Sequence, residues 1–134
     1  MNLGRMEQVA IPVRDLARAT AFYRDTLGMK LLFEVPPQLA FFDCEGVRLA
    51  LSISSDPMYD PPGSIVYYRV ADIEAAHAEL EGKAVEFLQG PHKVAELGDI
   101  EIWMAFFEDT EGNTLALTSE KPAERHDGAL DRRT

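Results

Sequence analysis

The chain contains two copies of one sequence pattern, and this repeat is the feature that most limits its fold. The segment "AFFDCEGVRLALS" at 40–52 matches "AFFEDTEGNTLALT" at 105–118, with one residue inserted at the turn. Each copy is an apolar run, an acidic turn with a glycine, and an alternating strand, which is the pattern of a β-hairpin. The sequence therefore predicts two similar substructures.

The repeat extends upstream, where each copy has a strand followed by a helix. The segments are "VAIPVRDLARATAFYRDTLG" and "IVYYRVADIEAAHAELEG". Asp15 and Asp72 precede apolar residues at helical spacing, so we expect each carboxylate to cap a helix N-terminus. Gly28 and Gly82 end the two helical patterns and predict left-handed C-terminal caps. The chain is thus expected to be an α+β fold of two βαβββ modules, at 6–54 and 64–120.

The remaining segments lack these patterns. The expected linker at 55–63, "SDPMYDPPG", contains three prolines and a glycine, which disfavour a strand or helix. The tail at 121–134 is polar and is expected to be flexible. At 134 residues, the two modules and these segments are expected to form a single domain.

Composition and charge restrict the classes of function. A net charge of −10 disfavours nucleic-acid binding, which depends on basic residues, and is compatible with a cationic ligand or simply with solubility. The sequence shows no apolar run of about 20 residues and no signal-peptide core, so we expect a cytoplasmic protein with no membrane partner. The single cysteine, Cys44, cannot form an internal disulfide and has no basic neighbour in sequence to activate it.

The two motifs "VAIPVRDLARATAFYRDTLGMKL" and "FFEDTEGNTLALTSE" resemble those of the glyoxalase/bleomycin-resistance/extradiol-dioxygenase superfamily, also called vicinal oxygen chelate proteins. The resemblance covers the chain from about residue 6 to residue 120. It implies that each module curls into half a barrel, that the site lies in a cleft on the concave face, and that the protein is a homodimer. This fold hosts isomerases, dioxygenases, drug-binding proteins and thiol transferases, so the resemblance alone does not assign an activity.

The resemblance also implies four metal-ligand positions, one on the first and one on the last strand of each module. They fall on Gln8, Ala50, Ile65 and Ala116. Alanine and isoleucine offer no donor atom, so Gln8 is the one family-position residue able to bind a metal. The three histidines, at 77, 92 and 126, show no metal-binding spacing. We therefore interpret Ala116 as a lost ligand and expect no cofactor, with a bound divalent metal as the alternative.

Because strand side chains alternate between faces, the same positions define the residues expected in the cleft. The cleft is expected to have an open floor lined by alanines, an apolar wall and several polar points, which suits a small organic ligand with an aromatic or acidic part. In the strand before the final hairpin, the resemblance implies that Ile102, Met104 and Phe106 face the cleft and that Trp103 and Phe107 lie in the core. The expected ligand-binding residues are Gln8, Arg48, Ala50, Tyr67, Arg69, Met104, Phe106, Thr114, Ala116 and Thr118.

Some of these residues have a simpler interpretation. Arg69 can be a surface charge paired with Glu7 or Glu101, and Tyr67 can be a packing residue. His92, in the segment "QGPHKVAEL" that we read as a loop, is a candidate general base or else a solvated histidine.

Three functional hypotheses follow. The first is a metal-independent binding protein of the bleomycin-resistance type. The second is a glyoxalase-like lyase or isomerase, or a dioxygenase, with a rearranged metal site that uses Gln8, Glu34 and Glu101. The third is a metal-independent enzyme that uses His92 or Tyr67 as acid or base. The first is favoured because at most one ligand position is preserved.

Overall fold

A computed structural model of the protein describes residues 1–53 and 64–123. The expected linker at 55–63 lies outside these residues, as does most of the expected tail. The chain forms two compact units. The first unit contains residues 1–65 together with 108–114, and the second contains 66–107 and the residues from 115 onward.

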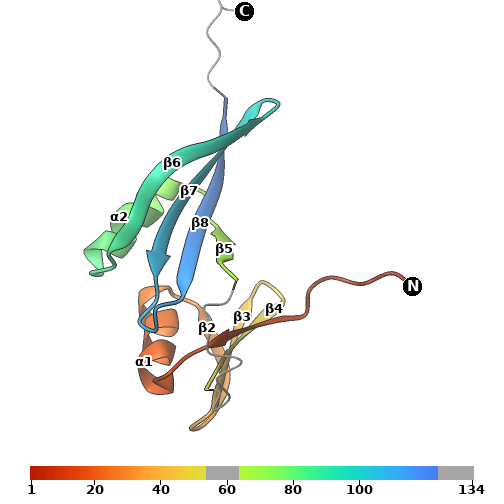
Figure 1. Ribbon diagram of the computed structural model, residues 1–134, viewed down its shortest axis with the longest axis vertical. Coiled ribbons are helices and arrows are strands. Elements are labelled where there is room, and N and C mark those ends of the chain that lie inside the picture. Colours follow the sequence, from red (N-terminus) through yellow and green to blue (C-terminus); the bar gives the residue numbers. More distant parts are fainter. Residues whose placement is uncertain (54–63, 124–134) are drawn as a thin grey trace, which may run out of the picture. The chain divides into compact units, whose positions relative to one another are not determined.

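The first unit is a four-stranded sheet with strand order β1-β4-β3-β2 and one helical segment (Figure 1). Strands β1 and β4 are parallel, whereas β3 is antiparallel to both β2 and β4. The elements are β1 (Gln8–Pro12), α1 (Leu16–Ala21), the π-helical turn η1 (Phe22–Thr26), β2 (Lys30–Val35), β3 (Leu39–Cys44) and β4 (Val47–Ser52).

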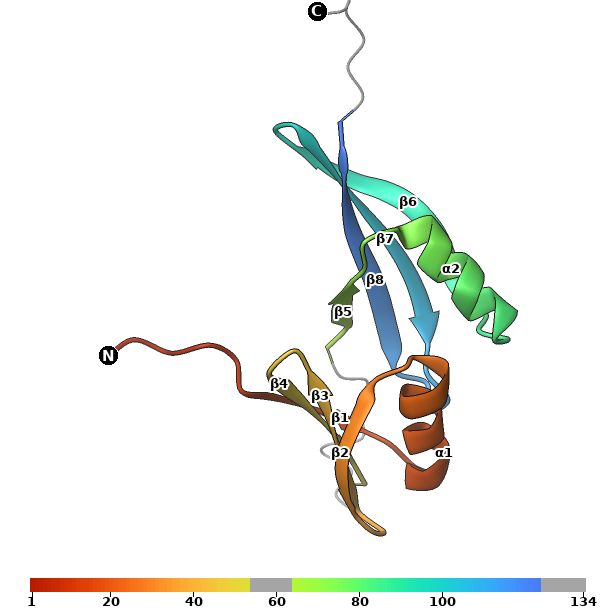
Figure 2. The same ribbon diagram turned by 180° about the vertical axis from the view of Figure 1, so that it is seen from behind.

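The second unit repeats this topology, with strand order β5-β8-β7-β6. Its neighbouring strands β5 and β8 are again parallel, and α2 lies along β6 and β7 in both views (Figures 1 and 2). The elements are β5 (Val66–Arg69), α2 (Ile73–Gly82), β6 (Phe87–Leu97), β7 (Ile100–Glu108) and β8 (Thr114–Pro122). The predicted α+β fold with two βαβββ modules is thereby confirmed.

The helix starts follow the predicted capping chemistry. Asp15 accepts a hydrogen bond from the backbone N–H of Arg18 at 3.0 Å, and Asp72 accepts one from that of Ala75 at 3.1 Å. Gly28 has the expected left-handed backbone, with φ of 74°. The prediction for Gly82 is wrong, because α2 includes Gly82 in its last turn.

Each unit buries its large apolar side chains on one face of its sheet. In the first unit, Tyr23 of η1 contacts Phe42 of β3 with ring centroids 6.0 Å apart, and both side chains are fully buried. In the second unit, Phe107 of β7 and Ile73 of α2 are fully buried. Burial of each such side chain contributes about 1.5–3 kcal/mol. We call this the helix-facing side of the sheet, and the opposite side the open face.

Among the described residues, no helix is both long enough and apolar enough to cross a bilayer.

Candidate functional site

The four family metal positions carry a poor set of donor atoms. Ala50 and Ala116 have none, and neither does Ile65. The side-chain oxygen of Gln8 already accepts a hydrogen bond from Nε of Arg48 at 2.8 Å, which places a positive charge beside the one remaining donor. Nowhere in the described parts of the chain do three His, Cys, Asp or Glu side chains come together as a metal site. These residues do not fit a divalent metal, which needs several N or O ligands.

The expected open floor of alanines is not found. Ala116 is fully buried and Ala50 is 3% exposed. Tyr67 of β5 is the register partner of Ala116 on β8, and its ring lies edge-on to that of Phe106 of β7, with centroids 6.3 Å apart. Because β8 lies between β5 and β7, the two rings meet over the small alanine side chain. The rings beside the alanines therefore form the surface that a ligand can contact.

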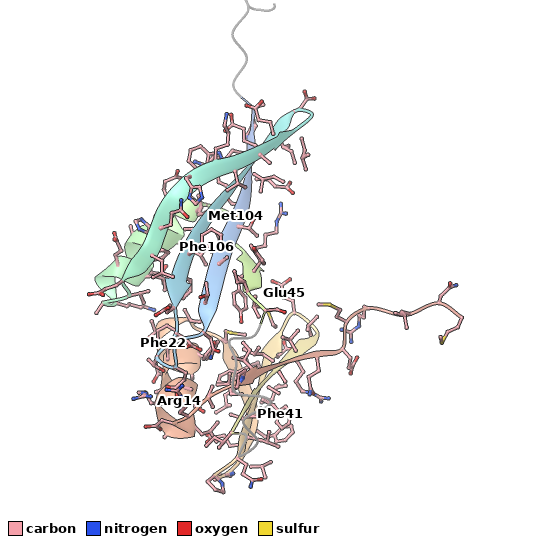
Figure 3. The ribbon with its side chains drawn as sticks, viewed as in Figure 1. Arg14, Phe22, Phe41, Glu45, Met104 and Phe106 are labelled. Carbon is pink, nitrogen blue, oxygen red and sulfur yellow. The ribbon has the colours of Figure 1, made fainter. Side chains whose placement is uncertain are left out.

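An aromatic cluster occupies the open face of the second unit. Phe106 is at its centre, in ring contact with Tyr67 and with His92, the latter at 6.1 Å. Met104 projects from the same strand (Figure 3) and is the register partner of His92 on β6. Tyr67 is 49% exposed, so a ligand could reach its ring and hydroxyl. The result is an apolar surface edged by a phenol and an imidazole.

His92 lies in strand β6 and not in the loop that was expected. Its Nδ1 is 2.8 Å from the carbonyl oxygen of Gly90. A carbonyl can only accept a hydrogen bond, so this contact requires the proton on Nδ1. In the neutral ring, Nε2 is then a hydrogen-bond acceptor.

The open face of the first unit carries a second aromatic cluster, which the sequence analysis missed. The rings of Phe33 and Phe41 have centroids 4.7 Å apart, and Cζ of Arg48 lies 5.5 Å from the Phe41 centroid. Phe41 is the register partner of Ala50. The internal repeat aligns Phe41 with Phe106, so this signal could have identified Phe41.

Arg69 forms an ion pair, although not with either of the expected partners. Its Nη1 lies 3.3 Å from Glu120, and both side chains are largely exposed. Such a surface pair contributes little to stability. Thr114 and Thr118 lie on β8 with Ala116 and are half-buried.

The carboxylates invoked for a rearranged metal site lie on the helix-facing sides of their sheets. Glu34 is the register partner of the buried Ala40. Glu101 is buried and lies on the same side of β7 as Ala105 and Phe107, which are also buried. It accepts a hydrogen bond from Nε1 of Trp103 at 2.9 Å. Trp103 itself is only half-buried, in contrast to its expected core position.

A polar turn at 109–113 packs within the first unit, and its role was also missed. Oε1 of Glu111 accepts hydrogen bonds from the backbone N–H groups of Arg14 and Asp15, at 2.8 and 2.9 Å. Its Oε2 accepts from Nε of Arg18 at 2.8 Å and from the hydroxyl of Thr110 at 2.9 Å. The Glu111 side chain is fully buried. Although desolvation opposes ionisation, these hydrogen bonds hold the pKa of its carboxyl at about 2.

Asp109 and Asn113 complete this turn. Oδ2 of Asp109 accepts from the buried hydroxyl of Tyr23 at 2.8 Å, and its Oδ1 accepts from the backbone N–H groups of Glu111 and Asn113. The Asn113 amide donates to the carbonyl of Pro12 at 2.9 Å. The turn thus connects the end of β1, the start of α1 and the start of η1.

The chain contains two four-stranded units, and in each the first strand pairs in parallel with the last. Each unit also has a single helical side and an open face with an aromatic cluster, which defines a paired βαβββ protein. Residues 5–117 match the Glyoxalase/Bleomycin resistance protein/Dioxygenase superfamily, and the chain belongs to this superfamily.

Similar proteins include both a binding protein and an enzyme. TnmS3, an antibiotic binding protein from Streptomyces sp. CB03234, is 26% identical, with a TM-score of 0.72 covering 92% of this chain and 99% of that one. Lactoylglutathione lyase from Agrobacterium tumefaciens is 21% identical, with a TM-score of 0.74 over 88% of this chain and 95% of its own, a likeness of fold alone. An uncharacterized protein from Mycolicibacterium smegmatis is 29% identical over 120 residues, which are 89% of this chain and 97% of that protein.

Proposed function

We propose that this chain is a metal-independent small-molecule binding protein of the bleomycin-resistance type. The proposal rests on the residues that occupy the four family metal positions, because they provide too few donor atoms for a metal. Alanines buried beside aromatic rings stand at two of them, an isoleucine at the third, and a glutamine bound to an arginine at the fourth. The similarity to the antibiotic binding protein TnmS3 supports a binding function.

The ligand we propose is a small organic molecule with a flat aromatic part. Phe41 and Phe106 occupy equivalent places in the two repeats, each on an open face beside an alanine. Aromatic rings stack or meet edge-to-face with a gain of about 0.5–1.5 kcal/mol beyond burial alone. Polar groups at the edges, such as the Tyr67 hydroxyl and Nε2 of His92, would orient such a ligand.

No specific observation favours the alternative of a lyase, isomerase or dioxygenase with a rearranged metal site. Glu34 and Glu101 lie on helix-facing sides, whereas the family positions Gln8 and Ala116 lie on open faces. A carboxylate on one side of a strand cannot share a metal with a ligand position on the other side of that sheet.

The first test is metal binding. We expect the purified protein to hold much less than one equivalent of metal by elemental analysis. Titration with Ni²⁺, Zn²⁺, Mn²⁺ or Fe²⁺ should leave its thermal midpoint unchanged, because too few donors converge. A stoichiometric metal that stabilises the protein would overturn the proposal.

The second test is ligand binding in the presence of a chelator. We expect 2-naphthol, as a neutral aromatic probe, to bind by calorimetry, and Phe41→Ala or Phe106→Ala to weaken that binding about five- to tenfold through lost stacking. Leu97→Ala is the matched control, since Leu97 is an exposed apolar side chain near the β6–β7 turn. Equal losses in the control and the Phe variants would show nonspecific apolar binding and count against the proposal.

We also propose a homodimer. The edge strands β2 and β6 carry exposed apolar side chains, including Leu32, Val35, Leu88 and Val94. Sedimentation equilibrium should give twice the chain mass of 14.9 kDa, and a monomer at all concentrations would contradict this. A cytoplasmic location stays a prediction.

A further inference from the structure

Arg48 presents a positive charge on the open face of the first unit, and no acidic side chain in residues 1–53 or 64–123 pairs with it. Its Nε donates to Gln8, and no described carboxylate forms an ion pair with it. Arg24 and Arg69, by contrast, each pair with a carboxylate. The terminal nitrogens Nη1 and Nη2 of Arg48 are thus available to an acceptor supplied by a ligand.

The neighbouring carboxylate does not neutralise this charge. Asp43 is the register partner of Arg48 on β3, so the two residues are direct cross-strand neighbours. Oδ1 of Asp43 instead accepts a hydrogen bond from the backbone N–H of Gly46 at 3.2 Å, within the β3–β4 turn. Asp43 remains close enough to compete electrostatically with a bound anion.

The guanidinium lies at the edge of an aromatic surface. Its Cζ is 5.5 Å from the Phe41 ring centroid, within the range of a cation–π interaction. Phe33 extends the surface and is 50% exposed. The hydrogen bond to Gln8 fixes one edge of the guanidinium, so its orientation is set before a ligand arrives.

We propose that the open face of the first unit binds aromatic carboxylates, with Arg48 pairing with the carboxylate and Phe41 and Phe33 contacting the ring. This inference rests on the proposed binding function and names the class of ligand. A planar arginine fork matches the two oxygens of a carboxylate, and a flat ring attached to that group can lie over the phenyl rings. The positive charge of Arg48, next to the family metal position at Gln8, thus favours a ligand with an anionic group.

The negative net charge of the protein affects how an anionic ligand can bind at this site. At a net charge of −10, long-range attraction of an anion is absent, so binding must come from short-range contacts with Arg48. Added salt screens exposed charges beyond about 10 Å and should therefore reduce the repulsion more than it weakens the contact.

The experiment compares 2-naphthoate with its neutral analogue 2-naphthamide by isothermal titration calorimetry. We expect 2-naphthoate to bind about tenfold more tightly, the increment of one charge-assisted hydrogen-bonded pair. Arg48→Gln should remove this preference and leave binding of the amide unchanged. Asp43→Asn keeps an acceptor for Gly46 but removes the competing charge, so it should tighten binding of 2-naphthoate. Arg24→Gln is the matched control, since Arg24 is an exposed arginine of η1 that pairs with Asp25, and it should change nothing.

The outcomes separate this inference from the proposed function. Equal affinities for the two compounds would overturn the inference and leave aromatic binding in place. A loss in Arg24→Gln as large as that in Arg48→Gln would show a general effect of charge and overturn the assignment to Arg48. If neither compound binds, the inference fails, and the metal titration decides separately whether the proposed function fails with it. Unchanged circular dichroism spectra of the variants are needed to attribute the losses to binding.

Discussion

Replacing Glu111 with alanine is expected to lower the free energy of unfolding by about 3 kcal/mol. The carboxylate of Glu111 is fully buried and accepts four hydrogen bonds, one of them from the guanidinium of Arg18. Its removal leaves a buried space and takes away the partner of two backbone N–H groups at the start of α1. Urea unfolding followed by circular dichroism measures the change.

The matched control is Glu120→Ala. Glu120 also forms an ion pair with an arginine, but its side chain is 41% exposed, compared with 0% for Glu111. Exposed pairs contribute about 0–1 kcal/mol, so the control should lose much less than the Glu111 variant. Comparable losses in the two variants would show that the Glu111 network does not stabilise the first unit.

Acid should destabilise the wild-type protein through the same carboxyl group. The pKa of Glu111 is lowered from 4.5 to about 2 in the folded protein, mainly by hydrogen bonds from Arg18 and from backbone N–H groups, which outweigh desolvation. Because the folded-state pKa lies below the unfolded value, the stabilisation is complete above about pH 4.5 and is lost as the pH falls toward 2. The group contributes about 3 kcal/mol at neutral pH, of which about 2 kcal/mol is lost by pH 3.

The Glu111→Gln variant isolates this contribution from the titration of other carboxyl groups. It lacks the titrating group, so the stability difference between wild type and variant should shrink as the pH is lowered from 7 to 3. Chemical denaturation at several pH values measures this difference directly. A difference that stays constant over this range would contradict the pKa assignment.

The features predicted well from sequence depend on residues close together in the chain. Asp15 and Asp72 bond to backbone groups three residues away, so the capping pattern was visible in the sequence. The alternation of strand residues likewise placed Arg48 on the opposite side of its strand from Leu49, and the family resemblance placed Phe106 opposite Phe107. The repeat predicted the topology of two βαβββ modules, because both copies of the pattern indicate the same order of strands and helix.

The features that were missed depend on distant contacts or on small differences in chain geometry. Glu111 bonds to residues 93 to 97 positions away, and its own segment reads only as a turn. His92 was placed in a loop because of the adjacent proline, yet β6 accommodates Pro91 next to register shifts. The buried alanines were read as an open floor because sequence alternation does not show which rings close over a small side chain.

The position of Glu111 in the chain has a consequence for protein synthesis. The start of α1 is synthesised before the carboxylate that bonds to it, which follows almost 100 residues later in the chain. Until then the N-terminal helix has its local cap and lacks its buried partner. We therefore expect the first repeat to gain its full stability only after the last hairpin of the second repeat has been synthesised.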